Sequence, residues 1–247
     1  MREQPFDGLS LFGRSGNRKY LNAAERHRFV QAASCAPAKV RLFCLTLRWS
    51  GARISEVLAL TAASIDIESG VASIESLKRR RRGIFRQVPL PSQLVKQLRG
   101  HFQVRRRQRD PNLASVRLWR WSRTTAWRHV KAIMAAAGIT GTQAMPKGLR
   151  HGFGVNAFQS NVPPHLVQRW LGHASLRTTG IYADVIGPDE RGFAARMWGT
   201  QVERPRARRR GSGETNDRRE RGHRFHSDSE KHRRSKERGG HHVRQIS

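Results

Sequence analysis

Apolar residues recur at helical spacing along most of the chain. From Asn22 to about Cys35 they follow that spacing behind an asparagine that can cap a helix, with Glu25 in the first turn. After Pro37, the run VRLFCLTLRWSG is apolar almost all round and ends at Gly51, which predicts a buried helix stopped by a glycine. The same spacing predicts helices in ISEVLALTAASID, PSQLVKQLRGHF, TTAWRHVKAIMAAAG, Gly148–Ser160, Pro163–Leu171 and GPDERGFAARMW.

One region follows a period of two instead. The segments VASIES and GIFRQVPLP are separated by a basic turn, and the residues from Ile84 to Leu90 alternate between two faces. Pro89 indicates an edge strand, because proline cannot donate a hydrogen bond to a neighbouring strand. We therefore expect a mostly α-helical fold with a small antiparallel β-hairpin or three-stranded sheet, in the α+β class.

The pattern weakens at both ends of the chain. Residues 1–18 are rich in Gly, Ser and Arg and predict a flexible lead-in. Residues 203–247 contain fifteen Lys or Arg and seven Asp or Glu, and Phe225 is their only aromatic residue. Such a segment buries too little apolar surface to offset the entropy of ordering it. We expect one folded domain over residues 19–202 and a disordered basic tail after it.

The charge of the chain is strongly positive. In total, 48 Lys and Arg against 18 Asp and Glu give a net charge of +30, of which residues 1–202 carry +22. A nucleic acid, an anionic membrane or an acidic protein could each balance this charge. No stretch approaches the roughly 18 apolar residues of a membrane span, and the first residues do not resemble a secretory signal. We expect a cytosolic protein without a membrane partner.

Four separated stretches contain residues suited to chemistry on a phosphodiester: SGARISEVLAL around Arg53, ESLKRRRRGIFRQVPLP around Lys78, PKGLRHGFG around Arg150, and LGHASLRTTGIYADV around His173 and Tyr182. In this order and spacing they resemble the catalytic boxes of the tyrosine recombinases, also called phage-type integrases. The resemblance covers about residues 19–200 and implies the catalytic-domain fold of that family. On its own, Tyr182 would be interpreted as a half-buried packing residue.

The resemblance implies a role for each of these residues. Tyr182 attacks the scissile phosphate and leaves a 3′-phosphotyrosyl link, Lys78 protonates the departing 5′-oxygen, and His173 hydrogen-bonds the phosphate. Guanidinium groups fit phosphate oxygens in a bidentate fork, which suits Arg53 and Arg150 to hold the charge that develops there. A phenol with a pKa near 10 needs surrounding cations or a base before it attacks at neutral pH.

Further residues support this site. Lys147 stands where the family most often has histidine, His151 matches a residue that acts as base or orienter, and Glu56 matches an acid that holds Arg53. Lys78 is preferred over its neighbours as proton donor, because arginine has a pKa above about 12. We expect the neighbouring arginines to contact the DNA backbone: Arg79, Arg80, Arg81 and Arg82.

The resemblance implies a site-specific recombinase that integrates, excises or inverts DNA of a mobile element. Its partners would be double-stranded DNA and further copies of the chain, in a tetramer on DNA. It would need no metal and no nucleotide cofactor, because the arginines supply the charge and the phosphotyrosine keeps the bond energy. Most relatives have a separate helical DNA-clamp domain before the catalytic one, and we expect this chain to have none.

Three other functions stay open. A type IB topoisomerase-like enzyme shares the chemistry and relaxes DNA without joining two sites. A non-catalytic DNA-binding remnant of a mobile element would bind without forming a covalent link. An RNA-binding protein fits the charge, but the sequence contains no stacked-aromatic platform for RNA.

Overall fold

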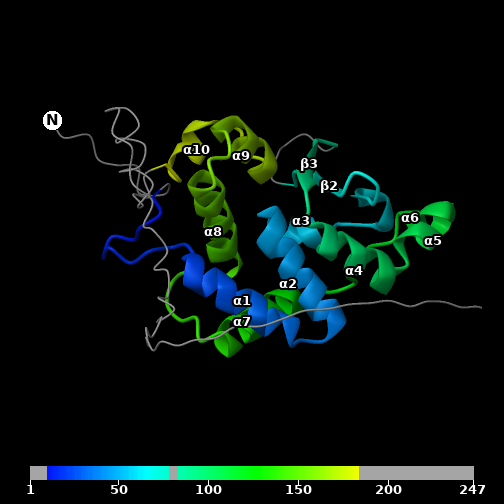
Figure 1. Ribbon diagram of the computed structural model, residues 1–247, viewed down its shortest axis with the longest axis horizontal. Coiled ribbons are helices and arrows are strands. Elements are labelled where there is room, and N and C mark those ends of the chain that lie inside the picture. Colours follow the sequence, from blue (N-terminus) through cyan, green and yellow to red (C-terminus); the bar gives the residue numbers. More distant parts are fainter. Residues whose placement is uncertain (1–9, 78–82, 184–247) are drawn as a thin grey trace, which may run out of the picture. The chain divides into compact units, whose positions relative to one another are not determined.

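The computed structural model describes residues 10–77 and 83–183 of the chain (Figure 1). The predicted residues Lys78, Arg79, Arg80, Arg81 and Arg82, the helix expected in GPDERGFAARMW and the tail after residue 202 lie outside them. The described residues form these elements: α1 (Ala23–Ser34), α2 (Ala38–Ser50), α3 (Ile54–Leu58), the 3₁₀ helix η1 (Ala62–Ser64), β1 (Ile65–Asp66), β2 (Val71–Glu75), β3 (Phe85–Pro89), α4 (Ser92–Phe102), α5 (Val104–Arg109), α6 (Pro111–Ala114), α7 (Arg123–Ala136), α8 (Pro146–Gln159), α9 (Pro164–Leu171) and α10 (Arg177–Gly180).

The strands form one antiparallel sheet in the order β1-β2-β3. Ala72 pairs with Val88 and Ile74 with Arg86, so these four side chains share the buried face of the sheet. Pro89 ends the edge strand β3, as its missing N–H requires. The predicted fold class, mostly helical with a small antiparallel sheet, is confirmed.

The two first predicted helices form as the sequence indicates. Asn22 accepts a hydrogen bond from the backbone of Glu25, and the Glu25 side chain accepts one from the backbone of Asn22, which is a complete capping box for α1. Helix α2 is buried at eight of its positions and ends at Gly51, whose φ of 62° is left-handed. A side chain at Gly51 would also collide with Phe153 of α8. Both the left-handed backbone and this close approach therefore require glycine there.

The helix predicted for ISEVLALTAASID is wrong beyond Leu58. There α3 ends, and Leu60 pairs through its carbonyl with the backbone of Leu118 instead of with its own helix. The Ser64 hydroxyl then accepts from the Thr61 backbone and starts the short η1, which leads into β1. Small hydroxyl side chains compete in this way with helical backbone bonds.

The structure differs from the sequence-based expectation in two further places, both in less hydrophobic segments. The short helices α5, α6 and α10 carry no apolar stripe that the sequence pattern could detect, although Val104 at the start of α5 is fully buried. Packing also begins before the expected boundary at residue 19. Leu11 is 2% exposed, its carbonyl accepts from the Lys19 backbone, and Phe12 and Arg18 form a β-bridge.

Helix α2 packs against α1, α4 and α8, and α8 also contacts α9 (Figure 1). The larger hydrophobic cluster joins α1 to α4, the sheet and α7, while a smaller one gathers side chains of α8 and α9 with Tyr182. Helix α8 therefore lies where the two clusters meet.

Within the described ranges, no helix has the length and apolar character to cross a membrane.

Candidate active site

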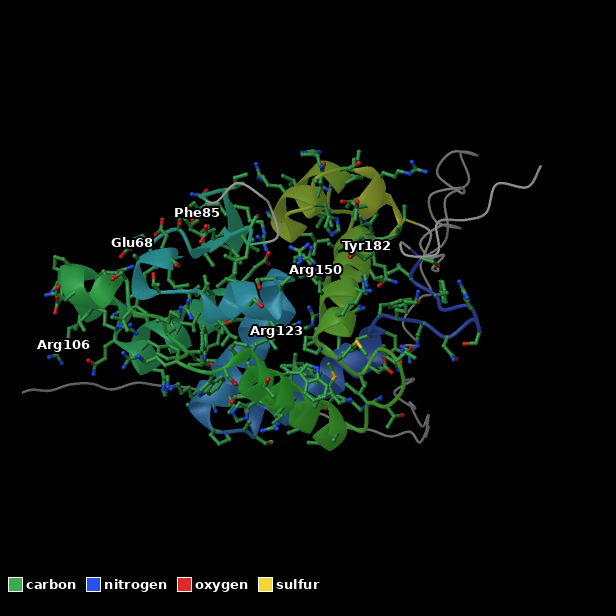
Figure 2. All side chains as sticks on the ribbon, turned by 180° about the vertical axis from the view of Figure 1, so that it is seen from behind. Glu68, Phe85, Arg106, Arg123, Arg150 and Tyr182 are labelled. Carbon is green, nitrogen blue, oxygen red and sulfur yellow. The ribbon has the colours of Figure 1, made fainter. Side chains whose placement is uncertain are left out.

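A cavity of about 390 Å³ brings together most of the residues singled out in the sequence. Its lining includes Arg53, Lys147, Arg150, His151, His173 and Tyr182. They come from the start of α3, the first two turns of α8, the residue after the C-cap of α9, and the segment that follows α10. Figure 2 labels Arg150 and Tyr182, which lie close together in that view.

Helix α8 supplies three of these side chains from one face. Lys147, Arg150 and His151 are spaced three and four residues apart, so they lie above one another on the helix. Pro146 occupies the first helical position, where its missing N–H costs nothing. The order K-x-x-R-H at the beginning of a helix therefore produces a row of nitrogen groups along the cavity.

The buried carboxylate of Glu56 binds Arg53 and orients its side chain. It caps the start of α3 with an extended backbone, and its Nη1 donates to Oε1 of Glu56 at 2.8 Å. The other carboxylate oxygen, Oε2, accepts from the Arg53 backbone N–H at 2.8 Å. The Glu56 side chain is fully buried, whereas the Arg53 side chain keeps 33% of its surface exposed. Arg53 can therefore meet a ligand while Glu56 fixes its direction.

Arg86, the second partner of Glu56, stands in no motif that marks it as a site residue in the sequence. Its Nη2 donates to Oε2 of Glu56 at 2.6 Å, its Nη1 to the Ser76 hydroxyl at 3.1 Å, and its Nε to the Trp170 carbonyl at 2.8 Å. Burial alone would raise the pKa of Glu56, but Arg86 and Arg53 outweigh burial, and the pKa is lowered. The available signal was a charged residue at an inward position of the strand pattern.

Arg150 is the most enclosed cation of the cavity. Its side chain donates from Nη1 to the Gly51 carbonyl at 2.8 Å and from Nη2 to the Leu171 carbonyl at 2.7 Å. These carbonyls end α2 and α9, where the helix dipole is negative. Burial, followed by repulsion from Arg53, lowers the pKa of Arg150 to about 10, so it stays charged at pH 7. Three of its five N–H donors are left for a ligand.

Two histidines flank the tyrosine. His151 Nδ1 lies 3.2 Å from the Tyr182 hydroxyl, and the His173 ring stacks parallel to the Tyr182 ring at 6.2 Å. Burial, and then the positive charge of Lys147 and Arg150, lowers the pKa of His151 to about 4. Burial also lowers the pKa of His173 to about 3, with Arg150 and Arg53 next in effect. Both rings are therefore neutral at pH 7.

The neutral rings have defined hydrogen-bonding roles. With its proton on Nε2, His151 accepts the phenol O–H of Tyr182 at Nδ1 and can take that proton. His173 Nδ1 lies 2.9 Å from the Thr179 hydroxyl, and with that hydroxyl as the donor His173 keeps an N–H at Nε2. Thr179 was not singled out in the sequence, and it contacts the His173 ring from within α10.

Tyr182 is both a packing residue and a lining residue of the cavity. Only 2% of its surface is exposed, and its ring packs in the smaller hydrophobic cluster. Gly154 of α8 makes room for the ring, since a Cβ there would lie 2.6 Å from ring carbons. Burial raises the pKa of Tyr182 to about 12, against the opposing effect of Arg150 and Arg53. The hydroxyl is therefore protonated at neutral pH and needs a base.

The family assignment follows from comparison with known proteins. The family model described as the phage integrase family matches residues 19–186. The chain belongs to the phage integrase family. This confirms the resemblance drawn from the four sequence stretches, since the matched residues include Arg53, Arg150, His173 and Tyr182.

Curated members of the phage integrase family show moderate sequence identity. Tyrosine recombinase XerA of Pyrococcus furiosus is 30% identical over 172 residues, which is 68% of this chain and 57% of the relative. Tyrosine recombinase XerD of Yersinia pestis is 28% identical over 142 residues, which is 55% of this chain and 46% of the relative. The chain thus spans about half the length of these curated relatives.

Solved structures of this family share the fold. The crystal structure of XerA recombinase matches with a TM-score of 0.58 and 23% identity, covering 74% of this chain and 66% of that one. XerH bound to a palindromic difH substrate, in a post-cleavage complex, matches with a TM-score of 0.57 and 25% identity. The match covers 78% of this chain and 57% of that one.

Proposed function

We propose that this protein is a site-specific recombinase that cleaves and rejoins duplex DNA through a covalent link between Tyr182 and a DNA 3′-phosphate. The observation that carries the proposal is the Tyr182 hydroxyl, hydrogen-bonded to a neutral His151 in a cavity lined by Arg53 and Arg150. Relatives named tyrosine recombinases, and the relative XerH bound to its difH substrate, support it.

The cleavage step uses the groups that line the cavity. His151 removes the phenol proton as the Tyr182 oxygen bonds to phosphorus and the bond to the 5′-oxygen breaks. Arg53 and Arg150 donate to the non-bridging oxygens, where negative charge grows, and His173 donates from Nε2. The phosphotyrosine keeps the energy of the broken bond, so rejoining needs no nucleotide cofactor. The guanidinium groups supply the charge stabilisation, so no metal ion takes part in the proposed step.

Lys78 is the proposed proton donor to the departing 5′-oxygen. The residue lies outside the described ranges, but its neighbour Ser76 and the catalytic His173 line one smaller cavity of about 250 Å³. Two residues of chain reach at most about 7 Å further. The chain length from Ser76 therefore supports the proposed role of Lys78, and we propose that the arginines at positions 79 to 82 contact the DNA backbone.

The proposal extends to assembly and domain organisation. Exchange of strands between two DNA sites requires several active sites, so we infer a homotetramer on DNA. We assign catalysis to residues 19–202 and added, sequence-independent DNA affinity to the basic segment 203–247.

Covalent trapping tests the proposed nucleophile. Nicked suicide duplexes from the flanks of the gene are incubated with the full chain, and a denaturing gel detects a protein–DNA adduct. Wild type and Tyr20→Phe, which changes the other tyrosine of the chain, should form the adduct, and Tyr182→Phe should form none. An adduct that persists in Tyr182→Phe, or none in wild type despite DNA binding, would refute the proposal.

A plasmid assay separates recombination from simple relaxation. A supercoiled plasmid with two copies of the trapped site should yield deleted or inverted products with wild type. Relaxed topoisomers without recombinant products would favour the topoisomerase-like alternative.

A further inference from the structure

A second cavity carries a dense positive charge that the proposed active site does not use. It has a volume of about 560 Å³ and shares no lining residue with the active-site cavity. We call it the basic groove. Five of its eleven lining residues are lysine or arginine and none is acidic; the five are Lys39, Arg106, Arg107, Arg117 and Arg120. His101 adds a further nitrogen group to the lining.

In the described part of the chain, no carboxylate forms an ion pair with a cation of the basic groove. On α5, Arg105 forms an ion pair with Glu68, but this pair lies outside the groove lining. Clustered like charges repel one another, and a polyanion would relieve that repulsion.

A strip of arginines connects the basic groove to the active-site cavity. Arg117 and Arg120 line the groove, and Arg123, three residues further, lines the active-site cavity. All three side chains are exposed, whereas Leu118 and Trp119 between them are buried in the core. The connecting segment is therefore fixed to the core by its apolar residues and presents its arginines to solvent.

Chain geometry limits the distance between the two sites. Six residues of extended backbone span at most about 20 Å, and duplex DNA rises about 3.4 Å per base pair. The backbone of Arg117 in the groove therefore lies within a length of about six base pairs of the backbone of Arg123 in the active-site cavity. In the view of Figure 2, Arg123 lies between Arg106 and the pair Arg150 and Tyr182.

We propose that the basic groove binds the phosphate backbone of the same DNA duplex, a few base pairs outward from the phosphate that is cleaved. The inference rests on the proposed function, which puts a DNA phosphate in the active-site cavity. A continuous backbone fits the arrangement better than an acidic protein, because the cations follow one another from the groove to the catalytic cavity. These contacts add affinity and orientation and do not select a base sequence.

The test compares two triple variants of the full chain, each with Tyr182→Phe to prevent cleavage. The groove variant carries Arg106→Gln, Arg117→Gln and Arg120→Gln. The matched control carries Lys96→Gln, Arg109→Gln and Arg128→Gln, which removes the same charge from exposed positions that line neither cavity. Arg107 is left unchanged because it donates to backbone carbonyls of Leu113 and Val116.

Binding constants are measured over a salt series on duplexes that end at increasing distances from the trapped phosphate. Each lost phosphate contact lowers the slope of log affinity against log salt by about 0.9. The groove variant should lose two to three units of slope and about 10- to 100-fold in affinity near 0.1 M salt. The loss should be absent on the shortest duplexes and should reach its full size once one side extends about six base pairs. The control variant should change the slope by less than about one unit.

Equal salt slopes in the two variants would overturn the groove proposal. So would a loss of affinity on the shortest duplexes as large as that on the longest ones. Unchanged DNA binding by the groove variant would overturn it too and leave an acidic protein as the partner to seek. The proposed function fails separately, by the absence of an adduct in the trapping assay. A salt-slope difference on uncleaved DNA would then still support a DNA-binding groove.

Discussion

Arg86 links three segments that meet at the proposed active site. Its guanidinium contacts the Glu56 carboxylate of α3, the Ser76 hydroxyl beyond β2 and the Trp170 carbonyl in α9. Glu56 in turn directs Arg53 toward the cavity. Since the side chain of Arg86 is 4% exposed and that of Glu56 is fully buried, removal of either residue would leave the other charge buried with fewer partners. Arg86 acts as a positioning residue and does not itself line the cavity.

Arg86→Met should destabilise the protein by about 3–5 kcal/mol, because it leaves the Glu56 carboxylate buried with one partner fewer. Arg105→Met is the matched control, since it breaks the exposed pair with Glu68 and should cost less than about 1 kcal/mol. Urea unfolding of both variants measures the difference. Equal losses would show that the buried pair contributes no more than the surface pair.

The residues of the candidate site could largely be found from the sequence, but their neighbours could not. Recognisable sequence motifs contain four of the site residues, and the cavity brings these four together: Arg53, Arg150, His173 and Tyr182. Thr179, by contrast, has no motif of its own, and its contact with His173 depends on how the chain folds back after α9.

At the scale of elements, the position of Tyr182 depends on a close approach to α8. Gly154 lies in the interior of that helix, where glycine is unfavourable compared with alanine by roughly 1 kcal/mol. The ring of Tyr182 occupies the space of the missing side chain. This contact also brings the hydroxyl to His151, one turn earlier on the same helix.

Gly154→Ala should therefore displace the Tyr182 ring and reduce adduct formation by at least about tenfold, while DNA binding stays near the wild-type level. Gly100→Ala on α4 is the matched control, because nothing lies within 4 Å of its added Cβ. The control should keep full activity and gain about 0.5–1 kcal/mol in stability. Single-turnover trapping and a binding assay on the same duplex measure both effects. Wild-type cleavage by Gly154→Ala would contradict the close packing of α8 on Tyr182.

The elements that the sequence predicted best are those whose apolar pattern is long. Helices α1, α2 and α7 and the strands β2 and β3 form where the periodicity is unbroken. The helix expected after Ile54 was too long, because hydroxyl groups of Thr61 and Ser64 replace the helical bonds. Helix α5 has four arginines in six residues and no apolar stripe. It forms because one buried residue, Val104, anchors it to the core.

At the scale of the whole molecule, charge governs both function and stability. A chain with 48 basic and 18 acidic residues attracts polyanions over distances set by the salt concentration. The same excess of cations surrounds the cavity and opposes any further positive charge there. His151 and His173 are the groups most affected, as burial and the adjacent Lys147, Arg150 and Arg53 keep their pKa values at about 4 and about 3.

These depressed pKa values predict a loss of stability in mild acid. In the unfolded chain, histidine takes up a proton near pH 6.5, whereas His151 and His173 in the folded protein do so only near pH 4 and pH 3. Between these limits the unfolded state binds more protons, so the free energy of unfolding falls as the pH is lowered from about 6.5. Glu25 and Glu56, whose pKa values are lowered, lose their contribution only below pH 4.5.

The range from pH 6.5 to 5 therefore isolates the two histidines. Urea unfolding at several pH values should give a shallower decline for the double variant His151→Gln and His173→Gln than for wild type. His27→Gln, at an exposed position of α1, removes one histidine without touching the cavity and should follow the wild-type curve. If the double variant declined as steeply as wild type, His151 and His173 would titrate in the folded protein at about the same pH as in the unfolded chain. That result would contradict the lowered pKa values that burial and the neighbouring cations give these two rings.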